Sequence, residues 1–102
     1  MYSIEILLTA KSDIESIINY ISNTLFNESA ARKLYGKILN SINSIKIFPF
    51  GNPIYKTEHK TKYQYRYTRT DNYLILYNVD ENKKLITIFR VVYRRMNISS
   101  II

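Results

Sequence analysis

The sequence predicts a single α+β domain of 102 residues, in which a helical hairpin packs on a small, mostly antiparallel sheet. Three observations predict this class. A short alternating segment opens the chain, two stripes of apolar residues at helical spacing follow, and three tyrosine-rich, β-prone segments come last. The resulting order, β-α-α-β-β-β, is that of an α+β fold covering residues 1–102, without repeats or a second domain.

The first strand is expected within residues 2–8, where Ile4 and Ile6 alternate with polar side chains. A helix follows, for which Thr9, Ser12 and Asp13 are the N-cap candidates. Its apolar face is formed by Ile14, Ile17, Ile18, Ile21 and Leu25.

A second helix is expected after a short break that Asn23 and Asn27 bracket, with Glu28 in its first turn. It must end by Phe48, because Pro49 disfavours helical geometry in the residue before it. Its apolar stripe, expected in the core, comprises Ala31, Leu34, Tyr35, Ile38, Ile42 and Ile45.

Three further strands are predicted at about 63–70, 73–80 and 84–93. Residues 71–72 and 80–83 supply the hairpin turns between them. The middle strand is apolar on both faces, which indicates a central place in the sheet.

Composition excludes several classes of protein. The chain has no cysteine, so it has no disulfide framework, zinc-thiolate site or cysteine nucleophile. No phosphate-loop, nucleotide or metal-binding motif occurs, so neither a cofactor nor a metal is expected. No segment approaches the roughly 18 apolar residues that span a bilayer, and a cytoplasmic protein without membrane contact is expected.

Positive charge is concentrated in the second half of the chain. The net charge is +7, and residues 51–102 hold ten Lys and Arg against four Asp and Glu. Arginines near the strand ends can bind phosphates bidentately, and tyrosines between them can stack on bases, a combination that suits single-stranded RNA. The alternative is a solvated basic face on which many tyrosines only pack.

Cleavage of RNA by its 2′-hydroxyl needs an acid, a base and a group that stabilises the phosphorane. Arg69 and Arg95 could stabilise that charge. The single histidine, His59, lies in a predicted loop, so the sequence offers few candidates for the general acid and the general base.

Nearly the whole chain resembles the RelE/ParE superfamily, the toxins of type II toxin–antitoxin (plasmid stabilisation) systems. The resemblance is carried by Ala10, Asp13, Ile14, Ile17, Tyr20 and Ile21, by Phe48-Pro49-x-Gly51-x-Pro53, by Tyr65-Arg66, by Asn72-Tyr73-x-Ile75-x-Tyr77-x-Val79, and by Arg90-Val91-Val92-Tyr93-x-Arg95-x-Asn97.

The resemblance implies a growth-arresting toxin that a cognate acidic antitoxin neutralises. It places Arg69, Tyr93 and Arg95 at catalytic positions of the RNA-cleaving branch. The nucleic-acid contacts expected beside them are Arg66, Arg94 and Lys62.

Three functions follow from the resemblance. The first is metal-independent cleavage of mRNA on the ribosome. The second is non-enzymatic inhibition of DNA gyrase, which the long hairpin and the Phe48-Pro49-x-Gly51 turn favour. The third is an inactive remnant or nucleic-acid-binding module that still binds its antitoxin.

Overall fold

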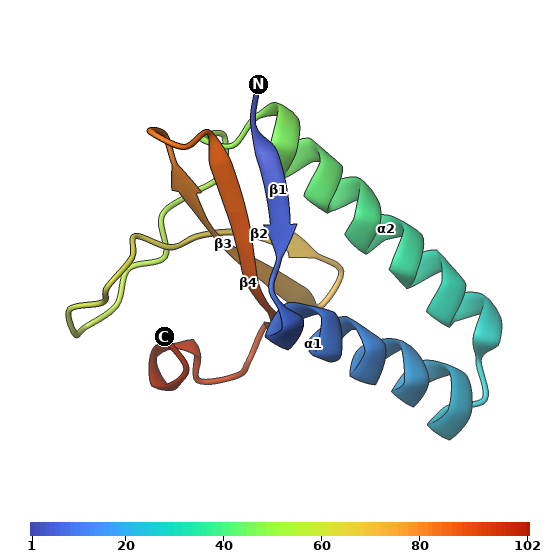
Figure 1. Ribbon diagram of the computed structural model, residues 1–102. Coiled ribbons are helices and arrows are strands. Elements are labelled where there is room, and N and C mark those ends of the chain that lie inside the picture. The colour runs from blue at the N-terminus through green and yellow to red at the C-terminus, as the bar shows by residue number, and fades with distance from the viewer.

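The computed structural model describes all 102 residues and confirms the α+β class. Two helices and four strands follow one another in the predicted order (Figure 1). A π-helical turn at Tyr20–Thr24 ends the first helix, and a 3₁₀ turn at Ile98–Ser100 lies near the C-terminus. The elements are β1 (Ser3–Ile6), α1 (Leu8–Asn19), α2 (Glu28–Ile47), β2 (Arg66–Thr70), β3 (Tyr73–Asp80) and β4 (Leu85–Tyr93).

The sheet has the strand order β1-β4-β3-β2, in which only the β1–β4 pair is parallel. The expectation of a mostly antiparallel sheet is therefore confirmed. β3 lies between β4 and β2, as its apolar faces indicated. Neither helix is long and apolar enough to cross a membrane.

Both faces of the sheet are covered. Eleven buried residues join one face to α1 and α2, with Ile38, Ile45 and Tyr77 among the fully buried ones. On the other face, four buried residues from β3, β4 and the C-terminal segment form a smaller cluster. β3 contributes to both clusters, through Ile75 and Tyr77 on one side and Leu74 and Leu76 on the other. Burial on both faces explains its uninterrupted apolar sequence.

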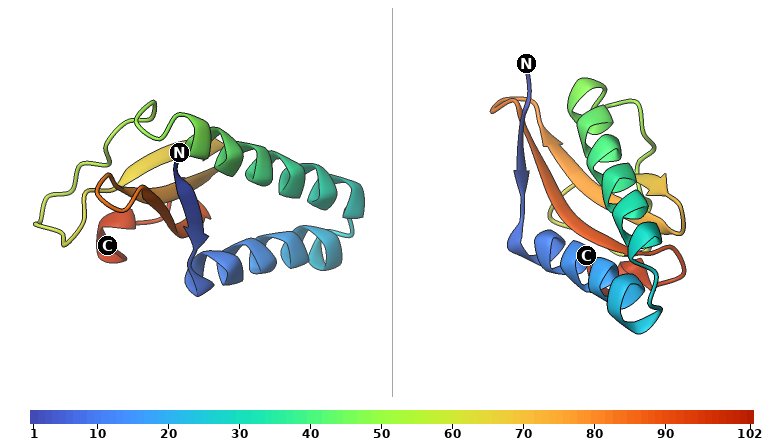
Figure 2. Two further views of the ribbon diagram at one scale, coloured as in Figure 1. Left: turned by 45° about the horizontal axis from the view of Figure 1, so that its top comes forward. Right: turned by 90° about the vertical axis from the view of Figure 1, so that its right-hand side faces the viewer.

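The helical hairpin is confirmed, and α1 and α2 diverge from its tip toward the sheet (Figures 1 and 2). Asn27 caps α2, because its Oδ1 accepts a hydrogen bond from the Ala30 amide at 3.1 Å. Two residues of the predicted apolar stripes are exposed. Tyr35 lies at the edge of the α2 stripe on the side toward α1, and Leu25 follows the helical residues at the tip.

β2 is shorter than predicted and begins at Arg66. Its first residue, Arg66, pairs with Tyr77 of β3 and also forms an antiparallel bridge with Ile54. Tyr55 donates its amide to the Tyr65 carbonyl at 2.7 Å, and Tyr67 donates to the Pro53 carbonyl at 3.1 Å. The chain after the proline turn therefore covers part of the outer edge of β2, which the sequence pattern did not reveal.

α1 begins at Leu8, before all three cap candidates, with Leu7 as N-cap and no side-chain cap. Thr9 and Asp13 lie inside the helix and serve the sheet instead. β1 pairs with β4 only as far as Ile88, so the edge of β4 beyond that residue lacks a partner strand. α1 takes the place of that strand.

Side chains of α1 provide hydrogen-bond partners for the backbone groups along this unpaired edge of β4. Thr9 Oγ1 donates to the Phe89 carbonyl at 3.0 Å, and Asp13 Oδ2 accepts the Val91 amide at 2.9 Å. The same carboxylate holds Arg90 bidentately, with Nε at 2.7 Å and Nη2 at 3.0 Å. This contact raises the pKa of Arg90, an effect that exceeds the opposing effect of burial. A bulge beside Phe89, where the β3–β4 register shifts, brings this part of β4 to the helix.

We predict that Asp13→Ala strongly destabilises the fold, because it leaves the Arg90 charge and the Val91 amide without their partner. Removal of one member of a largely buried ion pair lowers the free energy of unfolding by about 3 kcal/mol. Urea unfolding followed by circular dichroism measures this loss. Glu15→Ala, an exposed change on the same helix, should cost less than about 0.5 kcal/mol. Equal effects of the two substitutions would contradict the prediction.

We also predict a loss of stability in alkali that originates in the buried tyrosines. Burial raises the pKa of Tyr65, Tyr73 and Tyr77 in the folded chain. The free energy of unfolding should therefore fall above about pH 10, where the unfolded chain ionises first. The Arg90 pair does not contribute to this fall, because its stabilisation persists until the pH exceeds about 12.

Tyr77→Phe tests the origin of this alkaline transition. At neutral pH it should cost about 1 kcal/mol, because the Tyr77 hydroxyl donates to the Pro49 carbonyl at 2.7 Å. Above pH 10 the gap between variant and wild type should narrow, since the variant lacks one of the shifted phenols. If the unfolding free energies of the variant and the wild type run parallel as pH rises, Tyr77 does not contribute to the loss of stability in alkali.

Candidate functional site

Cationic side chains gather where the β2–β3 turn meets the residues that follow β4. The Arg94 amide donates to the Asn72 carbonyl at 2.8 Å, and Arg94 Nε donates to Asn72 Oδ1 at 3.3 Å. Asp71 occupies the left-handed region at φ 51°, which closes the two-residue turn. We call this region, with Arg69, Arg94 and Arg95, the arginine end of the sheet.

Arg69 and Arg95 are the exposed cations of the arginine end. Arg69 donates Nε to the Asp71 carbonyl at 2.7 Å, which fixes the base of its guanidinium. Its terminal amino groups make no hydrogen bond within the chain, and Arg95 makes none through its side chain. Asp71 is paired with Lys37 of α2 at 3.2 Å. Both guanidinium groups can therefore bind an anionic group of another molecule.

Tyr93 lies at the same end of the sheet but on the opposite face from Arg69. The register places Arg69 opposite Leu74, in the face that the C-terminal segment covers, and cross-strand neighbours share a face. Tyr93 pairs with Tyr73, which packs on the helix side, and their ring centroids are 6.0 Å apart. Burial, and next the proximity of Tyr93, raises the pKa of Tyr73, so this phenol is neutral at physiological pH.

Arg66 and Lys62 do not belong to the arginine end. Arg66 donates Nη1 to the Asn52 carbonyl at 2.7 Å, and its guanidinium lies 5.1 Å from the centroid of the Phe50 ring. It is anchored to the proline turn. Lys62 precedes β2 and so lies toward the opposite end of that strand from Arg69. Its Nζ is 5.3 Å from the centroid of the Tyr63 ring.

The only histidine is engaged elsewhere. His59 Nε2 lies 3.2 Å from the carbonyl oxygen of Ile102. No group of three His, Asp or Glu side chains that could hold a metal ion occurs. The arginine end thus offers cations to a phosphate or a carboxylate. Of the three residues expected to be catalytic, Arg69 and Tyr93 lie on opposite faces of the sheet.

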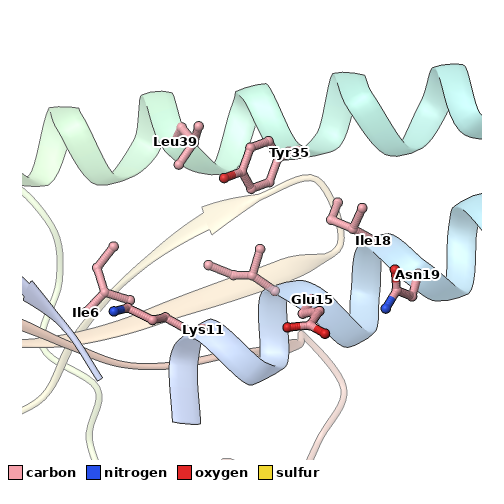
Figure 3. A pocket seen from close by; sticks show the side chains of 8 residues that line it. Ile6, Lys11, Glu15, Ile18, Asn19, Tyr35 and Leu39 are labelled. Carbon is pink, nitrogen blue, oxygen red and sulfur yellow. The ribbon is translucent and has the colours of Figure 1, made fainter. Parts of the chain in front are cut away.

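A groove lies between α1 and α2, and sequence reasoning missed it. It has a volume of about 520 Å³ and a mostly apolar lining. In Figure 3, Tyr35 and Leu39 of α2 face α1 across it, and Ile18, Lys11 and Glu15 lie on the α1 side. Tyr35 and Leu39 lie one residue beyond Leu34 and Ile38 of the buried stripe. The apolar stripe of α2 therefore extends beyond the residues that the core buries, and this extra width was the sequence feature that could have indicated the groove.

Comparison with known proteins identifies a family and solved structures of similar fold. Residues 4–98 match the profile of the ParE toxin of the type II toxin–antitoxin system parDE. The fold is similar to a solved structure described as the chromosomal ParDE toxin–antitoxin system from P. aeruginosa. That likeness has a TM-score of 0.71 at 16% identity, and covers 91% of this chain and 96% of the other. Comparison with curated proteins finds no match.

Proposed function

Because the chain belongs to the ParE toxin family of type II toxin–antitoxin systems, we propose that it arrests growth by binding DNA gyrase without enzymatic chemistry of its own. Its place in the ParE branch of the superfamily favours this target over the ribosome. The placement of Arg69 and Tyr93 on opposite faces of the sheet is the observation that carries the proposal.

Cleavage of RNA needs an acid, a base and a charge-stabilising group around a single phosphate. In this chain the exposed arginines share an end of the sheet, but Tyr93 is on the helix side and His59 contacts Ile102. Inhibition by binding requires no such convergence. It requires only surfaces that are complementary to a partner.

Ribosome-dependent mRNA cleavage is the second candidate. The exposed guanidinium groups of Arg69 and Arg95 favour it, because both could bind the phosphates of an RNA strand. In that mechanism the ribosome would provide the acid and the base that the chain does not assemble.

We further propose that a cognate acidic antitoxin neutralises the toxin by filling the groove between α1 and α2. Five of the eight groove residues are hydrophobic, and Tyr35 and Leu39 are exposed there without a partner. An amphipathic segment could bury its apolar side in the groove, while its acidic side faces a chain of net charge +7. Such a segment would fold as it binds.

The gyrase proposal is tested by inducing the chain in bacteria, with plasmid supercoiling and primer extension on a reporter mRNA measured in the same culture. We expect altered supercoiling or cleaved DNA while the mRNA stays intact. Arg69→Ala and Arg95→Ala test whether an observed effect depends on the arginine end. Arg32→Ala is the control, because Arg32 is exposed on α2 and pairs only with Glu28.

New in-frame mRNA cuts that disappear in Arg69→Ala or Arg95→Ala, but persist in Arg32→Ala, would contradict gyrase inhibition and establish the nuclease mechanism. Soluble wild-type chain that affects neither DNA nor mRNA nor growth would identify an inactive remnant.

For the antitoxin, we predict that Leu39→Glu weakens binding at least about tenfold, because it places a charge in the apolar groove opposite an acidic segment. Asn40→Glu adds the same charge to an exposed neighbouring position outside the groove lining, and should leave affinity nearly unchanged. Calorimetric titration at low and high salt measures both effects. Affinity should fall as salt rises. Equal losses in the two variants would argue against the groove as the binding site.

A further inference from the structure

The tip of the helical hairpin, residues 19–27, exposes large apolar side chains. Phe26 is 88% exposed and Leu25 is 54% exposed, and the nearby Tyr20 is also exposed. Figures 1 and 2 show the tip projecting away from the sheet, beyond the ends of its strands. These side chains therefore have no part in either hydrophobic core.

The tip also lacks charge. Residues 16–27 form a run of twelve without Asp, Glu, Lys, Arg or His, the longest such run in a chain that is 23% charged. The exposed helical surface on either side carries charged residues, such as Glu15 before the run and Glu28 after it. Depletion of charge together with exposed aromatic residues is the composition of the core of a protein–protein interface.

Hydrogen bonds hold the backbone of the tip on both sides of Phe26. The Leu25 amide donates to the Tyr20 carbonyl at 3.1 Å, and the Asn27 amide donates to the Ile21 carbonyl at 3.0 Å. Asn27 then caps α2 through Ala30. The tip is thus a fixed turn, and it presents Phe26 in a defined direction before any partner binds.

Phe26 occupies the left-handed region at φ 52°, at the position after a helix where glycine or asparagine is usual. Glycine would form the same turn without the steric strain that a side chain causes there. The aromatic ring gains almost no contact with its own chain in return, given its exposure. Strained residues of this kind are associated with functional sites.

We propose that the hairpin tip is a docking element that inserts Phe26 into an apolar, uncharged pocket of the toxin's protein target. This inference rests on the proposed function in so far as it assumes a protein target. The absence of cations on residues 16–27 leaves nothing to neutralise phosphates, which distinguishes the tip from the arginine end. The same absence leaves no charge complementarity with an acidic antitoxin.

Phe26→Gly tests the proposal, because it removes the ring and relieves the backbone strain in one change. We expect the melting temperature to stay the same or rise, while inhibition of gyrase supercoiling by the purified full chain falls at least about tenfold. Phe26→Asn, which also tolerates this backbone conformation, should behave alike. Phe48→Ala is the matched control, since Phe48 is 71% exposed at the other end of α2. It should inhibit like the wild type.

The outcomes separate this inference from the gyrase proposal. If the wild type inhibits gyrase and Phe26→Gly inhibits equally well, the docking role is wrong. If the wild type does not inhibit gyrase, but Phe26→Gly abolishes growth arrest while Phe48→Ala retains it, the docking role holds for another target and the gyrase proposal fails. Equal impairment in Phe26→Gly and Phe48→Ala would overturn the docking role. Phe26-dependent binding to uncharged phosphatidylcholine vesicles would also overturn it, in favour of a lipid surface.

Discussion

The contact of Asp13 with Arg90 and Val91 is the interaction on which the arrangement of this domain depends. β1 is only four residues long, so the edge of β4 would be open beyond Ile88. One carboxylate closes that edge by accepting the Val91 amide and holding the Arg90 guanidinium. Because Asp13 lies in the second turn of α1, the contact also fixes where the helix crosses the sheet. The packing of both helices on the sheet then sets the direction of the hairpin.

The register of the sheet decides which of the polar residues can act together. Each step along β2 alternates the face, so Arg69 falls on the side that the C-terminal segment covers. Tyr93 falls on the helix side, against Tyr73. Two residues that the resemblance would place in one catalytic centre therefore lie on opposite faces of the sheet. Binding through separate surfaces agrees better with this geometry than catalysis at one centre.

The domain presents three surfaces of different chemistry. The arginine end is cationic, the groove between α1 and α2 is apolar with a charged rim, and the hairpin tip is apolar without charge. A toxin must bind both a cellular target and a neutralising antitoxin, and distinct surfaces allow different partners to be recognised by different forces. α1 and α2 diverge from the tip toward the sheet (Figure 1), and the groove lies between them.

The sequence by itself determined the class of element at nearly every position, the central place of β3 and the family. Burial could be predicted from local patterns, because the spacing of residues within a helix or strand defines its faces. The helical spacing of Ile38, Ile42 and Ile45 and the apolar run of β3 are examples. Only the tertiary structure decided that Asp13 serves the sheet instead of a helix cap, that Arg66 is anchored to Phe50, and that Arg69 and Tyr93 face apart. These facts depend on the strand register, the β4 bulge and the splay of two helices. Contacts between residues distant in sequence set all three, and no local pattern encodes them.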